Sequence, residues 1–121
     1  MNDLNILNEI PDAFLEIDYR DIKNIFNEPT LIHLKGHKSP ALFISIMLHG
    51  NEFSGLHIMQ EILKKYKDTN GYALPRSIWL CVGNVEAASQ GLRRLDNELD
   101  FNRAWPGTPE PDAPTAKLIT Q

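Results

Sequence analysis

The chain has 121 residues, of which 42% are hydrophobic and 23% charged, and this composition predicts one globular domain with a sizeable core. Sixteen acidic residues against twelve basic ones give a formal net charge of −4, which argues against general binding to nucleic acid or to anionic membranes. The single cysteine excludes an internal disulfide, and no apolar run approaches the ~20 residues that a membrane-spanning helix needs.

The N-terminal third predicts short elements. Segment 1–10 has neither a basic leader nor a continuous apolar core, so we expect no signal peptide and a cytoplasmic protein. Residues 14–19 alternate apolar and acidic side chains, which favours a short outer strand. Residues 20–28 show helical spacing, and residues 30–35 predict another strand. Residues 36–40 are typical of a hairpin loop into the strand that follows.

The centre of the chain predicts a strand, a sharp turn and a helix. Residues 41–48 are apolar except for one serine and show no alternation, which indicates a strand that is covered on both faces. Gly50 allows a tight turn, and Asn51 is a suitable cap for a helix that starts there. Apolar residues then recur at helical steps and form a stripe that comprises Leu56, Met59, Leu63 and Tyr66. Glu52 lies four residues before Leu56, on the same stripe. The core-facing side of the helix should therefore open with a carboxylate.

A buried carboxylate needs a cationic partner, and His49 at the end of the strand can approach Glu52. Imidazole and carboxylate groups are donors that zinc binds at ~2.0–2.2 Å, so the two residues could be ligands of one metal ion. Alternatively, Glu52 favours the helix dipole and His49 caps a loop, without any metal. The short motif alone leaves both interpretations open. His33, His37 and His57 are expected to face solvent rather than to bind metal.

A second buried strand follows the helix. Residues 67–72 predict a turn by their Asn-Gly content, and residues 77–82 predict the strand, in which Cys81 serves as a small hydrophobic residue rather than a nucleophile. Two buried strands separated by a helix predict a parallel β-α-β unit, hence an α/β protein. Sites in such sheets lie at the carboxyl ends of the strands, so His49 and residues 83–84 should meet at one edge.

Three arginines lie close together in the segment 83–107. Arg93, Arg94 and Arg103 fall within eleven residues of an otherwise acidic protein, which indicates a pocket for an anion. Guanidinium groups bind carboxylates in a two-pronged geometry that lysine cannot match. The alternative is a set of solvated arginines that pair with nearby acidic residues, namely Asp96, Glu98 and Asp100.

Taken in order, four motifs of this chain resemble the succinylglutamate desuccinylase/aspartoacylase family, a branch of the zinc carboxypeptidase superfamily. These motifs are His49-Gly50-Asn51-Glu52, Gly83-Asn84, Gly91-Leu92-Arg93 and Asp100-Phe101-Asn102-Arg103. The resemblance covers about residues 30–107, and the ordered set is far more specific than any single motif. It implies a zinc-carboxypeptidase-like α/β/α fold with a mixed, largely parallel sheet.

The resemblance also implies the role of each matching residue: His49 and Glu52 as zinc ligands, Arg93 polarising the scissile carbonyl and holding the oxyanion, and Asn102 and Arg103 gripping the substrate carboxylate. The spacing between Arg93 and Asn102 is two residues longer than the family's shorter spacing. Arg94 therefore stays open as a substitute for Arg93.

The family supplies a third histidine ligand and a glutamate general base beyond these motifs, whereas this chain has no histidine after His57. Residues 1–121 are thus expected to be the N-terminal part of a single metallohydrolase domain, inactive or nearly so alone. The resemblance predicts that the parent protein is a zinc-dependent hydrolase of the amide bond in a small N-acyl amino acid or similar carboxylate-bearing substrate. The alternatives are a metallocarboxypeptidase acting on peptide C-termini and a non-catalytic module that binds an anion or a partner.

Overall fold

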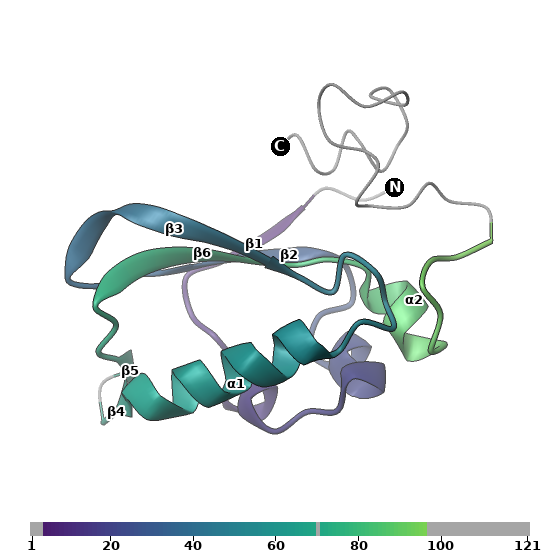
Figure 1. The fold of residues 1–121 in the computed structure, drawn as a ribbon, viewed down its shortest axis with the longest axis horizontal. Helices are drawn as coiled ribbons and strands as arrows, with labels where there is room; N and C mark the ends of the chain where they lie inside the picture. The colour runs from purple at the N-terminus through teal and green to yellow at the C-terminus, as the bar shows by residue number, and fades with distance from the viewer. Residues whose placement is uncertain (1–3, 70, 97–121) are drawn as a thin grey trace.

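The computed structural model describes residues 4–69 and 71–96. Over these residues the main sheet has the strand order β1-β2-β6-β3, and α1 lies along one face of it (Figure 1). β1 is parallel to β2, β2 is antiparallel to β6, and β3 is parallel to β6, so the sheet is mixed and mostly parallel. This arrangement confirms the predicted α/β class; the elements are Asn5–Leu7 (β1), Thr30–Leu34 (β2), Lys38–Ile46 (β3), Ser54–Tyr66 (α1) and Arg76–Val82 (β6).

The predicted β-α-β unit is formed by β3, α1 and β6. The two strands are parallel neighbours, with Ile46 opposite Val82 at their carboxyl ends. Beyond this pair, the backbone N–H of Gly83 donates to the carbonyl of Ile46 at 3.0 Å, and that of Asn84 donates to the carbonyl of Met47 at 2.7 Å. The chain segments that leave β3 and β6 are therefore joined at one edge of the sheet, as the sequence predicted.

β3 is not covered on both faces, contrary to the prediction. It is an edge strand of the described sheet, and the residues Leu42 and Phe43 are 54% and 53% exposed. Adjacent residues of a strand point to opposite faces, so both faces of β3 are exposed there. A continuous apolar run indicates a strand but does not identify the neighbours that cover it.

The predicted hairpin between β2 and β3 is also wrong, because β6 lies between these strands. The connecting loop instead pairs with the segment that leads into β6. The N–H of His37 donates to the carbonyl of Leu74 at 3.0 Å, and that of Lys38 donates to the carbonyl of Pro75 at 3.1 Å. The loop predicted from residues 36–40 is therefore present, but long-range contacts determine which strands pair.

α1 begins later than predicted. Its N-cap residue is Phe53, which makes no side-chain capping bond, so Asn51 is not the cap. The predicted apolar stripe is correct, since Leu56, Met59 and Leu63 are buried against the sheet. On the opposite side of the helix, His57 is exposed, as expected.

The predicted outer strand over residues 14–19 is wrong. This region forms two short 3₁₀ helices, η1 (Asp12–Leu15) and η2 (Tyr19–Asn24). Phe14 and Leu15 are adjacent yet both buried, a pattern that a strand with alternating faces cannot produce. Packing of Phe14 and Leu15 in the core therefore determines the structure of this segment, rather than its alternation of apolar and acidic side chains.

A side chain of α1 satisfies the backbone of this N-terminal segment. The amide of Gln60 donates to the carbonyls of Phe14 and Ile17, each at 2.9 Å. Gln60 is itself buried, so both its polar head and the two carbonyls would be costly to bury unpaired. The segment is thereby fastened to α1 without any strand pairing.

The remaining elements are short. α2 (Val85–Ser89) is capped by Asn84, whose side chain accepts from the N–H of Ala87 at 3.0 Å. β4 (Lys67–Asp68) and β5 (Gly71–Tyr72) form a two-stranded hairpin where the Asn-Gly turn was predicted. Within the described ranges, no helix has the length and apolarity required to cross a membrane.

Candidate metal centre and its surroundings

The candidate site lies in the turn between β3 and α1. Met47, the first residue after β3, has a φ of 59°, in the left-handed region that non-glycine residues rarely adopt. Such a conformation costs on the order of 1–2 kcal/mol and persists only where packing enforces it. Met47 is buried, so its packing holds the strained backbone in place. The sequence carries no signal of this bend, which turns the chain out of the strand just before His49.

His49 and Glu52 contact each other across this turn. His49 Nδ1 and Glu52 Oε1 are 2.7 Å apart, and the backbone N–H of Glu52 donates to the carbonyl of His49 at 3.1 Å. The His49 side chain is only 9% exposed, whereas that of Glu52 is 64% exposed. The predicted approach of His49 to Glu52 is confirmed. The prediction that Glu52 is buried is wrong. α1 begins two residues after Glu52, so the helical stripe does not extend back to it.

Gly50 joins this turn to a distant segment. Its N–H donates to the carbonyl of Arg93 at 2.9 Å. A Cβ built on Gly50 would lie 2.4 Å from the backbone nitrogen of Ala88 and 2.6 Å from the carbonyl oxygen of Leu92. Only glycine permits this close approach of backbones, which places the Gly91-Leu92-Arg93 motif against the His49 turn.

The arginine candidates differ in how the structure places them. Arg93 and Arg94 are both exposed, and the main chain of Arg93 is held by Gly50. Arg94 Nη1 donates to the carbonyl of Leu95 at 3.3 Å. The predicted substrate-gripping residues, Asn102 and Arg103, lie outside the described residues.

Aromatic side chains flank the turn on the side of η2. The ring of Phe53, the residue after Glu52, stacks on Tyr19 with centroids 5.2 Å apart. The His57 ring also packs against Phe53, with ring centroids 5.5 Å apart. Arg20 in turn approaches the Tyr19 ring. No local sequence pattern connects Tyr19 with the turn, because its contact with Phe53 spans more than thirty residues of chain.

The other candidate groups are separate from this turn. His33 packs on Trp79 with ring centroids 4.5 Å apart, and this pair belongs to neighbouring positions of β2 and β6. Burial raises the pKa of the Cys81 thiol to about 11. A thiol with so high a pKa is scarcely ionised near neutral pH, which agrees with a packing role rather than a nucleophilic one.

The donor atoms of the turn fit a zinc ion in part. An imidazole nitrogen and a carboxylate oxygen are both zinc donors, and they already face each other. A tetrahedral ion with ligands at about 2.0–2.2 Å separates two donors by roughly 3.4 Å, so this pair would open by roughly 0.7 Å. No group of three or more His, Cys, Asp or Glu residues suited to a metal occurs within residues 4–69 and 71–96. The described residues therefore supply two ligands and not a complete site.

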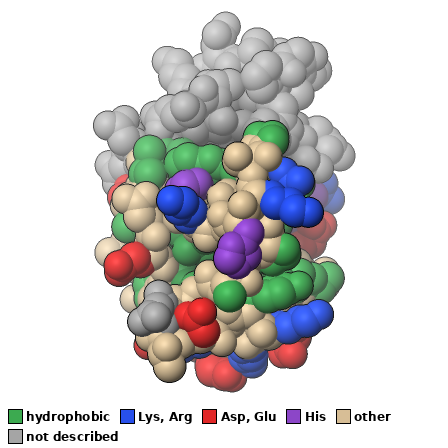
Figure 2. All heavy atoms as spheres, turned by 90° about the vertical axis from the view of Figure 1, so that its left-hand side faces the viewer, with side chains coloured by type: hydrophobic (Ala, Val, Ile, Leu, Met, Phe, Trp, Pro, Cys, Tyr) green, Lys and Arg blue, Asp and Glu red, His purple; other side chains and the backbone are tan. Residues whose placement is uncertain are grey.

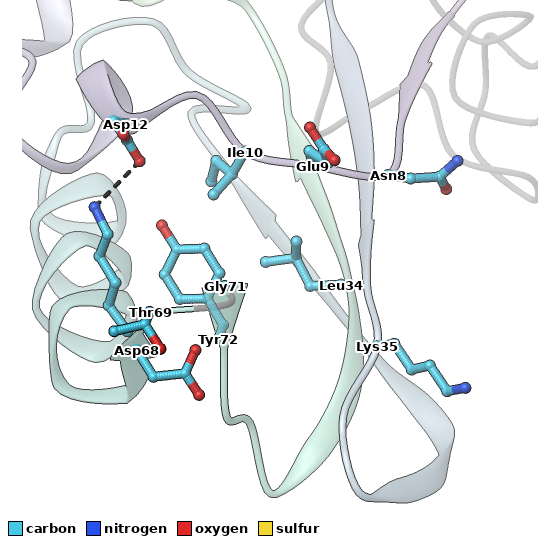
Figure 3. A pocket seen from close by; sticks show the side chains of 11 residues that line it. Asn8, Glu9, Ile10, Asp12, Leu34, Lys35, Asp68, Thr69, Gly71 and Tyr72 are labelled. Atoms are coloured by element: carbon cyan, nitrogen blue, oxygen red, sulfur yellow. Dashed lines mark hydrogen bonds and ion pairs between the residues drawn. The ribbon is translucent and has the colours of Figure 1, made fainter.

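A cavity of about 530 Å³ lies at the other end of the sheet, around the β4–β5 hairpin. Figure 2 shows this end of the molecule, where side chains of both charges and histidines lie among hydrophobic ones. In Figure 3, Tyr72 stands among the lining residues; its hydroxyl has no hydrogen-bond partner in the described part of the chain, and burial raises its pKa. α1 extends from the His49 turn at its start to this hairpin at its end, so the cavity is not part of the metal centre.

Comparison with known proteins agrees with the motifs of the turn. No curated protein and no solved structure matches the chain. The model of the succinylglutamate desuccinylase/aspartoacylase catalytic domain, however, matches residues 38–120, well over half of the chain. The matched region contains β3, the His49 turn, α1, β6 and the arginine segment. The chain therefore belongs to the succinylglutamate desuccinylase/aspartoacylase family, and its catalytic-domain sequence is that of a hydrolase.

Proposed function

We propose that the protein containing this chain is a cytoplasmic, zinc-dependent hydrolase that cleaves the amide bond of a small N-acyl amino acid or a similar carboxylate-bearing substrate. The observation that carries the proposal is the 2.7 Å contact between His49 Nδ1 and Glu52 Oε1 at the carboxyl end of β3. Substrates of α/β proteins commonly bind at this edge of the sheet. The family match over the same turn supports a hydrolytic role for it.

His49 and Glu52 would hold the metal. A bound zinc ion would supply Lewis-acid polarisation of the scissile carbonyl and would lower the pKa of a water molecule toward ~7. The small exposed fraction of His49 would keep the ring in one orientation, whereas the carboxylate of Glu52 is accessible from solvent. Binding through Nδ1 would require that nitrogen to lose its proton, so zinc would replace the hydrogen bond between the two residues.

Arg93 is the better of the two candidates for stabilising the developing oxyanion. Its backbone is fixed against Gly50, directly after His49, so the base of its side chain has a defined position relative to the metal ligands. Fixed donors contribute most to such stabilisation, because they need no reorganisation during the reaction. Asn102 and Arg103 are proposed to bind the substrate carboxylate, as the family resemblance implies.

Zinc binding tests the metal centre directly. Titration calorimetry on the 121-residue chain should show one weak zinc site, because catalytic zinc ions normally have three protein ligands and residues 4–69 and 71–96 supply two. His49→Ala and Glu52→Gln should each weaken binding by about tenfold or more. His37→Ala and Glu61→Gln, which alter an exposed histidine and an exposed glutamate away from the turn, should leave the affinity unchanged. Equal losses in all four variants would refute the assignment.

Hydrolysis assays test the reaction in the longer protein expected from the sequence. Release of free amino acid from N-acyl amino acids, abolished by a chelator and restored by zinc, is the expected result. Cleavage of peptides from their C-termini would instead support the metallocarboxypeptidase. Zinc binding without any hydrolysis of either substrate class would favour the non-catalytic binding module.

A further inference from the structure

The outer edge of β3 carries backbone groups that turn away from the sheet. In the described part of the chain, β6 is the only strand that pairs with β3. The carbonyl of Ile46 accepts from the N–H of Gly83, just after β6, so the backbone groups of Ile46 turn toward β6. Successive residues of a strand turn their N–H and C=O groups to alternate sides. Those of Ala41, Phe43 and Ser45 therefore turn outward, where another strand can pair with them.

This edge lacks the features that usually prevent strand pairing. Edge strands of natural proteins are commonly protected by charged side chains, prolines or bulges. Residues 41–46 contain neither a charged residue nor a proline. The irregularity in the pairing of β3 lies between Lys38 and Leu42, and from Leu42 to Ile46 the register with β6 is continuous. The second half of β3 is therefore a regular, uncharged edge.

Exposed apolar side chains lie beside this edge on the α1 side of the sheet. Leu42 is on the same face of β3 as the buried Ile46, yet it is more than half exposed. On α1, Ile58 and Ile62 are four residues apart and are both exposed. They lie on the same side of the helix as Gly55, whose added Cβ would lie 3.1 Å from Ile46 Cγ2. This side of α1 therefore faces β3, and the three exposed side chains form one apolar border.

The edge is complementary to itself. When two copies of β3 run antiparallel with Phe43 opposite its counterpart, Ala41 of each copy lies opposite Ser45 of the other. The outward N–H and C=O groups of these residues then form about six backbone hydrogen bonds. In the same register, Leu42 lies opposite Ile44 of the second copy on the α1 face, and the two Phe43 rings are neighbours on the other face. The apolar borders of the two copies are thereby brought together.

A second copy suits this edge better than the residues of the chain that lie outside the described ranges. The sequence of residues 97–121 has no apolar run as long as that of β3, and it contains four prolines, at positions 106, 109, 111 and 114. Four side chains along the edge of one copy are about half exposed, namely Leu42, Phe43, Ile58 and Ile62. With the strand backbone, they would bury about 1,000 Å² in the pair, which is near the lower limit of specific interfaces.

We propose that β3 pairs antiparallel with β3 of a second copy of this chain, so that the two four-stranded sheets become one continuous sheet. The small interface predicts a dimer with a Kd in the micromolar range, on the order of 1–100 μM. The inference does not depend on the proposed function. Because the two β3 strands run in opposite directions, the two His49 turns would lie at opposite ends of the joined edge, and zinc binding should not change on dimerisation.

Sedimentation equilibrium of the 121-residue protein over about 1 μM to 1 mM tests the dimer. Phe43→Lys would place two like charges opposite each other and should raise the Kd about tenfold or more. Ser45→Pro would remove one outward N–H while leaving the pairing with β6 intact, and it should weaken the dimer similarly. The control Ile6→Lys alters an equally exposed apolar residue on β1, the other edge strand of the described sheet, and should leave the Kd unchanged.

Hydrogen exchange followed by NMR tests the register in the wild type. The amides of Ala41, Phe43 and Ser45 should exchange more slowly as the protein concentration rises, whereas the exchange of the β1 amides should not depend on concentration. This measurement also decides the question if the β3 variants do not fold.

A monomer over the whole concentration range would overturn the inference, as would open-ended assembly or an equal loss of association in Ile6→Lys. Slow exchange of the three amides at every concentration would also overturn it. That result would place a strand of the same chain on this edge, including one supplied by the longer protein expected from the sequence. Unchanged zinc affinity in Phe43→Lys would separate the dimer from the metal centre, whereas a loss of zinc binding in this variant would overturn the proposed geometry.

Discussion

Replacement of Gly50 by alanine tests whether the close approach at the His49 turn holds the site together. The added methyl would lie 2.4 Å from the nitrogen of Ala88 and 2.6 Å from the carbonyl carbon of Ala87. Both neighbours are backbone atoms, so a side-chain rotation cannot relieve the overlap. The turn and α2 must separate, which weakens the hydrogen bond from Gly50 to Arg93. Overpacking of this kind costs about 1–3 kcal/mol.

Urea unfolding followed by circular dichroism measures this loss, and zinc titration measures its effect on the metal ligands. Gly55→Ala is the matched control, because its added Cβ would lie 3.1 Å from a side-chain atom, Ile46 Cγ2, which can move. The free energy of unfolding of Gly55→Ala should stay within about 1 kcal/mol of the wild-type value. In a helix, alanine is favoured over glycine by about 1 kcal/mol, which offsets the cost of moving Ile46. An unfolding free energy of Gly50→Ala equal to that of Gly55→Ala, with unchanged zinc affinity, would refute the reasoning.

Two further predictions concern the core. Leu63 is fully buried on α1, so Leu63→Ala should lower the free energy of unfolding by about 2–5 kcal/mol in urea, whereas Ile58→Ala on the exposed side of the same helix should change it little. The raised pKa of Cys81, about 11 against an ordinary 9.0, favours the neutral thiol in the folded state. This preference stabilises the folded state fully below pH ~9, where the thiol is neutral in both the folded and the unfolded chain. The stabilisation, at most about 3 kcal/mol, is lost as the pH rises to ~11. Between pH 8 and pH 11, the free energy of unfolding in urea should therefore fall less for Cys81→Ala than for the wild type. Equal decreases in the two proteins would contradict this prediction.

Local sequence patterns were sufficient to predict the order of the main elements and the close approach of two candidate site residues. The apolar runs of β3 and β6 and the helical stripe of α1 are local patterns whose periods match strand and helix geometry. They placed His49 at the end of a strand and brought it close to Glu52, because a three-residue separation in a turn limits how far apart the side chains can lie. The ordered motifs identified the family for the same reason, since each is a short local pattern.

Long-range contacts, in contrast, establish which strands are neighbours, where α1 begins and how exposed Glu52 is. β6 inserts between β2 and β3 through contacts across some forty residues, which no local pattern records. The strained backbone of Met47 and the tight contact at Gly50 depend equally on distant partners. Arg20 approaches Gly91, about seventy residues later in the chain, because η2 packs beside α2, and no local sequence pattern indicates this contact. Long-range packing, which overrides local periodicity, is the physical reason for each of these differences.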